Sequence, residues 1–429
     1  MSEKVNNSAL ETDVILEVKN LKKYFPIEKD LFGRPTKYLK AVENVSFKLN
    51  RGTTIGVVGE SGCGKTTLGR TILKLYESDG GQILFDGKDI TNISKSKMRK
   101  LRTSMQLIFQ DPYSSLPPRM TIGNIISEAV KVHKIVPKEE TFKYVLDIMK
   151  KCGLQPSYYD RYPHEFSGGQ RQRICIARAL AVKPKLVICD EPVSALDVSI
   201  QAQIINLLKD LQIKNDLTYV FISHDLSVVK YITDQIMVMY LGNVMEFGNT
   251  DDIFDNPMHP YTKALFSAVP VPDPDVKMNR IILKGDIPSP ANPPKGCKFH
   301  TRCENCMSVC KFKDPVYLEK EPNHFVACHL FNEEVMKDKD KYDEQYDRFE
   351  KGEIPFEELL DKEVVEEKYD LEDTLDEQTD NVVEPVDLSK IKNRKEEDYV
   401  LQIKLDRKSS QMYRNIRNRG KNDSLKGNE

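Results

Sequence analysis

Residues 59–66 read Gly-Glu-Ser-Gly-Cys-Gly-Lys-Thr and match the phosphate-loop pattern G-x-x-x-x-G-K-T. The pattern follows an apolar run at 54–58 and precedes a predicted helix at 65–75, the strand–loop–helix context that it requires. Backbone N–H groups and the helix dipole there favour phosphate. We expect Lys65 to reach the β- and γ-phosphates of a nucleotide and Thr66 to ligate Mg²⁺. The predicted phosphate contacts are Gly59, Ser61, Gly62, Cys63, Gly64, Lys65, Thr66 and Thr67.

A pair of carboxylates, Asp190 and Glu191, follows the apolar run at 186–189. An Asp at the end of a buried strand can hold the Mg²⁺ shell beside a phosphate loop. The next residue, Glu191, is placed to polarise the attacking water as a general base. Alone, the pair could equally be an acidic strand end without a role. Beside a phosphate loop, the functional interpretation is favoured.

Two more polar side chains, Gln110 and His224, each follow an apolar run. An amide at 110 can touch both Mg²⁺ and water, and can report phosphate occupancy to the helical segment that follows. An imidazole at 224 can donate to the γ-phosphate, although a lone His after a strand is usually structural. The predicted catalytic residues are Glu191, His224, Gln110 and Lys65, and the predicted Mg²⁺ ligands are Thr66, Gln110 and Asp190.

A second candidate cradle for an anion is the Ser-Gly-Gly-Gln segment at 167–170. It reads as a helix start, where a hydroxyl, free N–H groups and the dipole suit a phosphate. One chain does not need two complete cradles for one nucleotide. We therefore expect this cradle to serve ATP held by another subunit, in a sandwich dimer.

The elements that must carry these residues alternate between strands and helices, which predicts an α/β body with a mainly parallel sheet. The expected strands lie at 14–18, 42–49, 54–58, 186–189 and 219–222, with a helix at 199–211. Residues at about 112–178 are expected to form a helical subdomain.

Composition narrows the class of protein. The chain has 429 residues, of which 39% are hydrophobic and 30% charged, and a formal net charge of −2. That charge gives no bulk electrostatic case for a nucleic-acid partner. No apolar run approaches the roughly 20 residues that span a bilayer, and the polar N-terminus lacks the apolar core of a signal peptide. We therefore expect a cytoplasmic protein, which would still be able to dock on a membrane protein.

In these motifs the chain resembles the ATP-binding cassette (ABC) ATPases over residues 14 to about 330. The resemblance implies a RecA-like core, an antiparallel β subdomain and a helical subdomain. It also implies a head-to-tail dimer, in which each ATP lies between one phosphate loop and the other subunit's Ser-Gly-Gly-Gln segment. The residues that would act across that interface are Ser167, Gly168, Gly169, Gln170 and Asp197. An aromatic side chain stacks on adenine in this family, and we expect Phe25 first and Tyr24 second.

A narrower resemblance is to the ATPase subunits of oligopeptide and dipeptide importers. It rests on residues 110–116, 119–121, 259–265 and 270–274, while Pro117 replaces the usual Asn. The insertion at 26–37 is typical of one of the two paralogous ATPases, the one denoted F. This resemblance implies a heterodimer with a paralogous ATPase, two transmembrane permeases, an extracellular substrate-binding protein and a place at the cytoplasmic face of the membrane.

Nine cysteines are present, and those after 296 are grouped. In some members of this subfamily, the matching positions Cys297, Cys303, Cys310 and Cys328 hold a [4Fe–4S] cluster, and Cys306 is additional. Thiolates in a reducing compartment favour Fe–S or Zn²⁺. Zinc and metal-free packing stay open as alternatives, in each case with a structural role away from the nucleotide.

We expect a flexible N-terminus at 1–12, an ABC ATPase domain at 13–268, an extension at 269–331 and a disordered tail at 332–429. The extension opens with a Pro-rich connector, and the tail is dominated by Asp, Glu and Lys. Transient helices are expected near 356–369.

The sequence thus predicts an ATP- and Mg²⁺-dependent motor of an importer for oligopeptides or dipeptides. The alternatives are an importer ATPase for another solute such as nickel, a soluble ABC ATPase acting on ribosomes or DNA, and a non-catalytic interaction protein. The single cassette and the intact Lys65 and Glu191 weigh against the last two.

Overall fold

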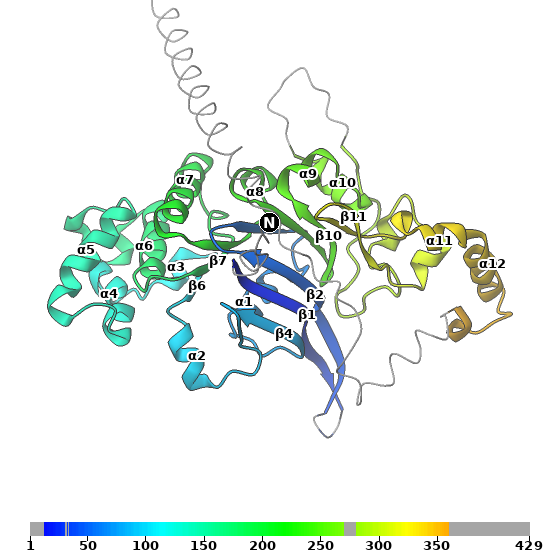
Figure 1. The fold of residues 1–429 in the computed structure, drawn as a ribbon, viewed down its shortest axis with the longest axis horizontal. Coiled ribbons are helices and arrows are strands. Elements are labelled where there is room, and N and C mark those ends of the chain that lie inside the picture. Colours follow the sequence, from blue (N-terminus) through cyan, green and yellow to red (C-terminus); the bar gives the residue numbers. More distant parts are fainter. Residues whose placement is uncertain (1–12, 31, 33, 270–279, 360–429) are drawn as a thin grey trace, which may run out of the picture. The chain divides into compact units, whose positions relative to one another are not determined.

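The structure is a computed structural model that describes residues 13–30, 32, 34–269 and 280–359 (Figure 1). Three sequence expectations lie outside the described residues. These are the flexible segment at 1–12, the prolines of the connector at 270–274, and the part of the tail from 360 onward.

An eight-stranded sheet forms the centre of the described chain, in the order β11-β12-β10-β9-β3-β8-β7-β6. The five strands from β9 to β6 pair in parallel, and β10, β12 and β11 continue the sheet with antiparallel pairs. The strand bounds are β3 Thr54–Val58, β6 Met105–Ile108, β7 Leu186–Asp190, β8 Thr218–Ile222, β9 Gln235–Tyr240, β10 Asn243–Asn249, β11 Tyr317–Glu321 and β12 His324–Ala327.

Both faces of the parallel strands are buried. On β7, Leu186 and Ile188 pack in the cluster formed with the first helix and the antiparallel sheet, whereas Val187 and Cys189 pack in the cluster on the opposite face. Continuous apolar runs, not alternating ones, are what such doubly covered strands require. This is why the runs before Asp190 and His224 are apolar throughout. The predicted α/β architecture is confirmed.

A four-stranded antiparallel sheet, in the order β2-β1-β4-β5, forms the predicted β subdomain. Its strands are β1 Val14–Lys29, β2 Pro35–Asn50, β4 Gly80–Phe85 and β5 Lys88–Asp89. The described residues of the expected insertion at 26–37 extend the pairing of β1 with β2, in which Pro26 pairs with Tyr38 and Lys29 with Pro35.

The helical subdomain begins after Gln110. Its helices are α3 Pro112–Ser115, α4 Ile122–His133, α5 Thr141–Lys151 and α6 Gly168–Leu180. Helix α3 starts where the Asp111 carboxylate accepts the backbone N–H groups of Tyr113 and Ser114. Helix α6 starts at a capping box in which Ser167 and Gln170 satisfy each other's backbone N–H groups.

The remaining helices of the ATPase body connect or cover the strands. They are α1 Lys65–Ile72, α2 Lys95–Leu101, α7 Val198–Asn215, α8 Leu226–Ile232, α9 Thr250–Asp255 and α10 Pro260–Phe266. Helix α1 ends earlier than predicted and α7 continues further, since helix ends are set by tertiary contacts as well as by local sequence.

The extension is continuous with the ATPase body, because β12 pairs with β10 and thereby adds two strands to the central sheet. The fully buried Glu246 of β10 joins them: its carboxylate accepts the N–H groups of Met258 and His259 and lies 2.7 Å from Nε2 of His324 on β12. A buried carboxylate needs such partners to offset its lost hydration.

The expectation of disorder from 332 is wrong for the residues up to 359. They form α11 (Glu333–Lys337), α12 (Lys339–Glu350) and a 3-10 turn at Phe356–Leu359. The Tyr342 and Tyr346 rings of α12 lie 6.1 and 6.2 Å from the Phe312 ring of the cysteine segment. These aromatic contacts hold a helix whose other side chains are mostly charged.

Candidate functional site

The phosphate loop connects β3 to α1, and its geometry requires glycine. Gly64 has φ +107°, and a Cβ there would lie 2.1 Å from the Ala41 carbonyl oxygen. The Lys65 ammonium is buried and donates to the carbonyl oxygens of Gly59 and Glu60 at 2.8 and 2.9 Å. The cation is therefore held inside the loop, where phosphate oxygens would compete with those carbonyls for it.

The two predicted Mg²⁺ ligands on α1 and β7 lie side by side. The Thr66 hydroxyl donates to Oδ1 of Asp190 at 2.7 Å, and Arg70 lies 3.9 Å from the other carboxylate oxygen. Burial raises the pKa of Asp190, against the lowering effect of Thr66 and Arg70. A bound divalent cation would favour the ionised form, so this hydroxyl–carboxylate pair suits Mg²⁺.

Three predicted catalytic side chains converge at the ends of β6, β7 and β8. Nε2 of Gln110 donates to Oε2 of Glu191 at 2.7 Å, and Nδ1 of His224 lies 3.3 Å from the same oxygen. Adjacent parallel strands end at one sheet edge, which brings together residues far apart in sequence. Glu191 itself has φ +47°, an uncommon conformation for a non-glycine residue that is often found at functional sites.

The Ser-Gly-Gly-Gln segment lies beside the loop before α7. A Cβ on Gly168 would be 3.3 Å from Leu196, and one on Gly169 would meet Ile200 at 2.4 Å. Asp197 is the N-cap residue of α7, where its carboxylate accepts the Ser199 hydroxyl at 2.7 Å. In the described part of the chain, the hydrogen bonds of residues 167–170 stay within α6 and its cap, so no hydrogen bond joins them to the phosphate loop of the same chain.

The two candidate adenine-stacking residues differ in their surroundings. The Tyr24 hydroxyl donates to the Glu43 carboxylate at 2.8 Å. Burial is the largest effect that raises the pKa of Tyr24, and the Glu43 carboxylate raises it further. The Phe25 ring is half-buried and meets Tyr76 edge-on at 5.4 Å. Both rings are thus engaged by neighbouring side chains, and Phe25 remains the first prediction for the stacking residue.

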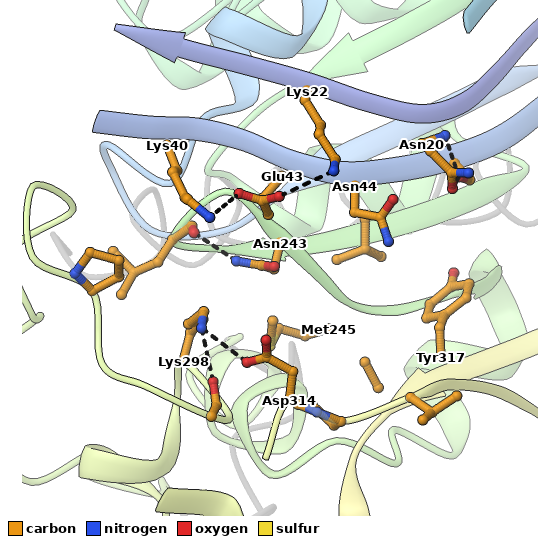
Figure 2. A pocket seen from close by; sticks show the side chains of 18 of the residues that line it. Asn20, Lys22, Lys40, Glu43, Asn44, Asn243, Met245, Lys298, Asp314 and Tyr317 are labelled. Carbon is orange, nitrogen blue, oxygen red and sulfur yellow. Dashed lines mark hydrogen bonds and ion pairs between the residues drawn. The ribbon is translucent and has the colours of Figure 1, made fainter. Parts of the chain in front are cut away.

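A pocket of about 720 Å³ lies between β1, β2, the start of β10 and the extension (Figure 2). Figure 2 shows that its charged side chains are largely paired: Lys22 and Lys40 face Glu43, and Lys298 binds Asp314. None of the predicted catalytic residues lines it. We therefore assign the nucleotide to the phosphate loop and not to this pocket.

The cysteines of the extension lie near one another but do not form a ready metal site. Burial raises the pKa of Cys297 to about 12 and that of Cys328 to about 11. The neighbouring Cys310 thiol lowers the pKa of Cys306. Within residues 13–359 as far as they are described, no three His, Cys, Asp or Glu side chains are arranged to hold one metal ion.

The extension also reaches the phosphate loop, which the sequence did not predict. Arg302, next to Cys303, forms a 2.7 Å ion pair with Glu60, and the Tyr261 hydroxyl accepts the Glu60 N–H at 3.0 Å. The cysteine segment is therefore joined to the phosphate loop through Arg302. No local pattern in the sequence links these residues.

Comparison with known families matches two parts of the chain. The ABC transporter model matches residues 42–194, and the model for the C-terminal region of oligopeptide/dipeptide transporters matches residues 245–310. The oligopeptide transport ATP-binding protein AppF of Bacillus subtilis is 55% identical over 76% of this chain and 100% of its own length. OppF of Haemophilus influenzae is 52% identical over 74% of this chain and 97% of its own.

Solved structures match the ATPase body. A dimeric ATP-binding cassette in a post-hydrolysis state, bound to ADP and Pi, has a TM-score of 0.50 and 26% identity, and the match covers 55% of this chain and 99% of that one. The protein cbiO1 of Clostridium perfringens, part of an ABC transporter complex, has a TM-score of 0.50 and 30% identity over 57% of this chain and 92% of its own.

A protein with this sheet and this grouping of side chains is an ATPase of the ATP-binding cassette type, which uses ATP and Mg²⁺. The chain belongs to the oligopeptide/dipeptide transporter family of ABC ATP-binding proteins. Membership implies that it works with permease subunits in a membrane. Among its described helices, none is both long and apolar enough to cross a bilayer.

Proposed function

We propose that this chain is the ATP-hydrolysing motor subunit of a multisubunit importer, bound at the cytoplasmic face of the membrane, that takes up oligopeptides or dipeptides. The observation that carries the proposal is the contact of both Gln110 and His224 with Glu191, beside the Thr66–Asp190 pair. The peptide class is supported by the names of the relatives AppF and OppF.

The roles proposed for the site follow from its chemistry. Lys65 binds the β- and γ-phosphates, and Thr66, Gln110 and Asp190 hold Mg²⁺, which neutralises phosphate charge when bound. Glu191 accepts the proton of the attacking water, while Gln110 and His224 keep its carboxylate in position. His224 is 60% exposed and is therefore accessible to a γ-phosphate.

Residues 167–170 and Asp197 are proposed to act on ATP bound by a second ATPase subunit. In support of this proposal, the side-chain hydrogen bonds of these residues are made within the starts of α6 and α7 and do not reach the phosphate loop of the same chain. We infer a paralogous subunit as the second ATPase, because the long β1–β2 hairpin at 26–37 is the feature that resembles one of two paralogues.

Two permease subunits and an extracellular substrate-binding protein complete the proposed importer. Gln110 leads directly into α3 and the helical subdomain. A change at the γ-phosphate would therefore be passed through Gln110 to these helices and on to a permease.

Reconstitution tests the transported solute. Vesicles holding the complete complex, loaded with ATP inside and given the binding protein outside, should accumulate labelled oligopeptide. Uptake of Ni²⁺ but not peptide would favour the alternative of an importer for another solute. ATP turnover without any association with membrane subunits would favour a soluble ABC ATPase.

We further propose that Cys297, Cys303, Cys310 and Cys328 ligate a [4Fe–4S] cluster, with zinc or metal-free packing as the alternatives. Support comes from the donor chemistry and from the electrostatic interaction of Cys297 with both Cys303 and Cys328. The thiols would have to move together and ionise, because they are not assembled as ligands. Anaerobically purified protein that contains no iron and has no absorbance near 400 nm would contradict the cluster.

A further inference from the structure

A residue of the C-terminal extension, Arg302, contacts the phosphate loop. Nη1 of Arg302 lies 2.7 Å from Oε2 of Glu60, although 242 residues separate them. The side chains are only 8% and 23% exposed, respectively. Ion pairs at such burial are screened little by water or salt.

Both the main chain and the side chain of Glu60 are held. The Tyr261 hydroxyl accepts its N–H at 3.0 Å, and Arg302 binds its carboxylate. The Phe299 ring, in the same turn as Arg302, lies 5.3 Å from the Tyr261 ring and 5.4 Å from that of Tyr240. One turn of the extension thus contacts Glu60 directly through Arg302 and packs against Tyr261, which binds the Glu60 N–H.

Glu60 places a carboxylate in a loop that must receive several phosphate charges. Its own carbonyl oxygen accepts a hydrogen bond from the Lys65 ammonium. An unpaired carboxylate at this position would repel phosphate and compete for the lysine. Arg302 supplies the compensating positive charge.

We propose that Arg302 is a positioning residue of the nucleotide site: by neutralising and fixing Glu60, the C-terminal extension sets the affinity of the phosphate loop for ATP. The inference rests on the ATPase activity of the family and is independent of the transported solute. The competing explanation is that the ion pair only attaches the extension to the ATPase body.

Breaking the pair from each side separates these explanations. Arg302→Gln leaves a carboxylate unpaired in the loop, so the full-length chain should bind MgATP about tenfold more weakly, a loss of about 1.4 kcal/mol of binding free energy. Glu60→Gln leaves an unpaired cation there, so affinity should stay the same or rise. The double variant should bind within about threefold of the unaltered chain, because no carboxylate is left unpaired.

Two further measurements complete the test. In the assembled complex, Arg302→Gln should raise the KM for ATP by a similar factor and change kcat less than about twofold. Lys298→Gln is the matched control, because it breaks the 3.0 Å pair with Asp314 in the same segment, away from the loop. Its ATP affinity should be unchanged.

Equal losses of affinity in Arg302→Gln and Glu60→Gln would overturn the proposal, because simple attachment predicts the same direction from both sides. Unchanged affinity in Arg302→Gln would overturn it as well. If Arg302→Gln does not fold, the ATP affinity of Glu60→Gln is the deciding measurement. A weaker affinity of Glu60→Gln for MgATP would contradict the electrostatic role of Arg302.

Discussion

The side chain of Gln110 donates a 2.7 Å hydrogen bond to the carboxylate of Glu191, 81 residues further along the chain. The two residues follow β6 and β7, which are neighbours in the parallel sheet. His224, at the end of β8, lies 3.3 Å from the same carboxylate oxygen. Three loops that leave one sheet edge thus meet at a single oxygen atom, which makes Glu191 the residue whose change should be most informative.

Glu191→Gln should reduce ATP turnover by at least about a hundredfold, because an amide cannot accept the proton of the attacking water. ATP binding should remain, and the ATP-bound dimer should accumulate. Phosphate release by the assembled complex, together with size-exclusion chromatography in ATP, measures both effects. Turnover at the rate of the unaltered protein would refute the assigned base.

Ser167→Arg should abolish turnover only in the assembled complex. The substitution puts a bulky cation where the partner's phosphates are expected, but Ser167 has no hydrogen bond to the phosphate loop of its own chain. The isolated chain should therefore bind ATP normally, as measured by equilibrium titration. A similar loss of ATP binding by the isolated chain would contradict a role across the interface.

Acid should destabilise the fold through His259. Burial lowers its pKa from 6.5 to about 4, against the opposing effect of Glu246. Between these values the unfolded chain takes up a proton that the folded chain does not, so the free energy of unfolding falls as the pH drops. Across the whole range between the two pKa values, the free energy of unfolding falls by about 3 kcal/mol.

Urea denaturation at pH 7 and pH 5 should measure about 2 kcal/mol of this loss, because pH 5 lies above the folded-state pKa. His259 also caps α10 by accepting the Tyr261 N–H at 3.0 Å. His259→Asn keeps a capping side chain without a titrating group, so it should flatten the pH dependence. An unaltered pH dependence in that variant would assign the acid sensitivity elsewhere.

His324→Ala should destabilise the chain by about 3 kcal/mol, because it leaves the buried Glu246 carboxylate without its side-chain partner. His324→Gln keeps a donor and should cost less. Lys320→Ala, which removes only a 3.9 Å pair with the exposed Glu333, serves as the control and should change stability little. Equal denaturation midpoints for all three would show that the His324–Glu246 pair does not stabilise the fold.

The residues proposed to bind the nucleotide could be predicted because each lies in, or directly after, a short sequence pattern. Gly59 to Thr66 form a contiguous motif, and Asp190 and His224 follow short apolar runs that are typical of buried strands. Neighbouring parallel strands then bring their ends together. Only the order of the strands was hidden, because it depends on pairing between distant segments.

The extension was less predictable, for two physical reasons. Its contact with Glu60 joins residues 242 apart, and no local pattern specifies such a pair. The charged composition after 332 also concealed a helix, since averaging over the tail hides the aromatic side chains at 342, 346 and 349. These lie three and four residues apart, the spacing that puts them on one helical face.

The pairing of β12 with β10 has a consequence for how far the chain can be shortened. A protein ended near residue 268 would keep every nucleotide motif. It would also leave β10 as a bare strand edge, with unpaired N–H and C=O groups at Glu246 and Phe247. Such edges recruit strands from other molecules. The shortened ATPase is therefore expected to self-associate and precipitate, with the extension acting as the cover that keeps it monodisperse.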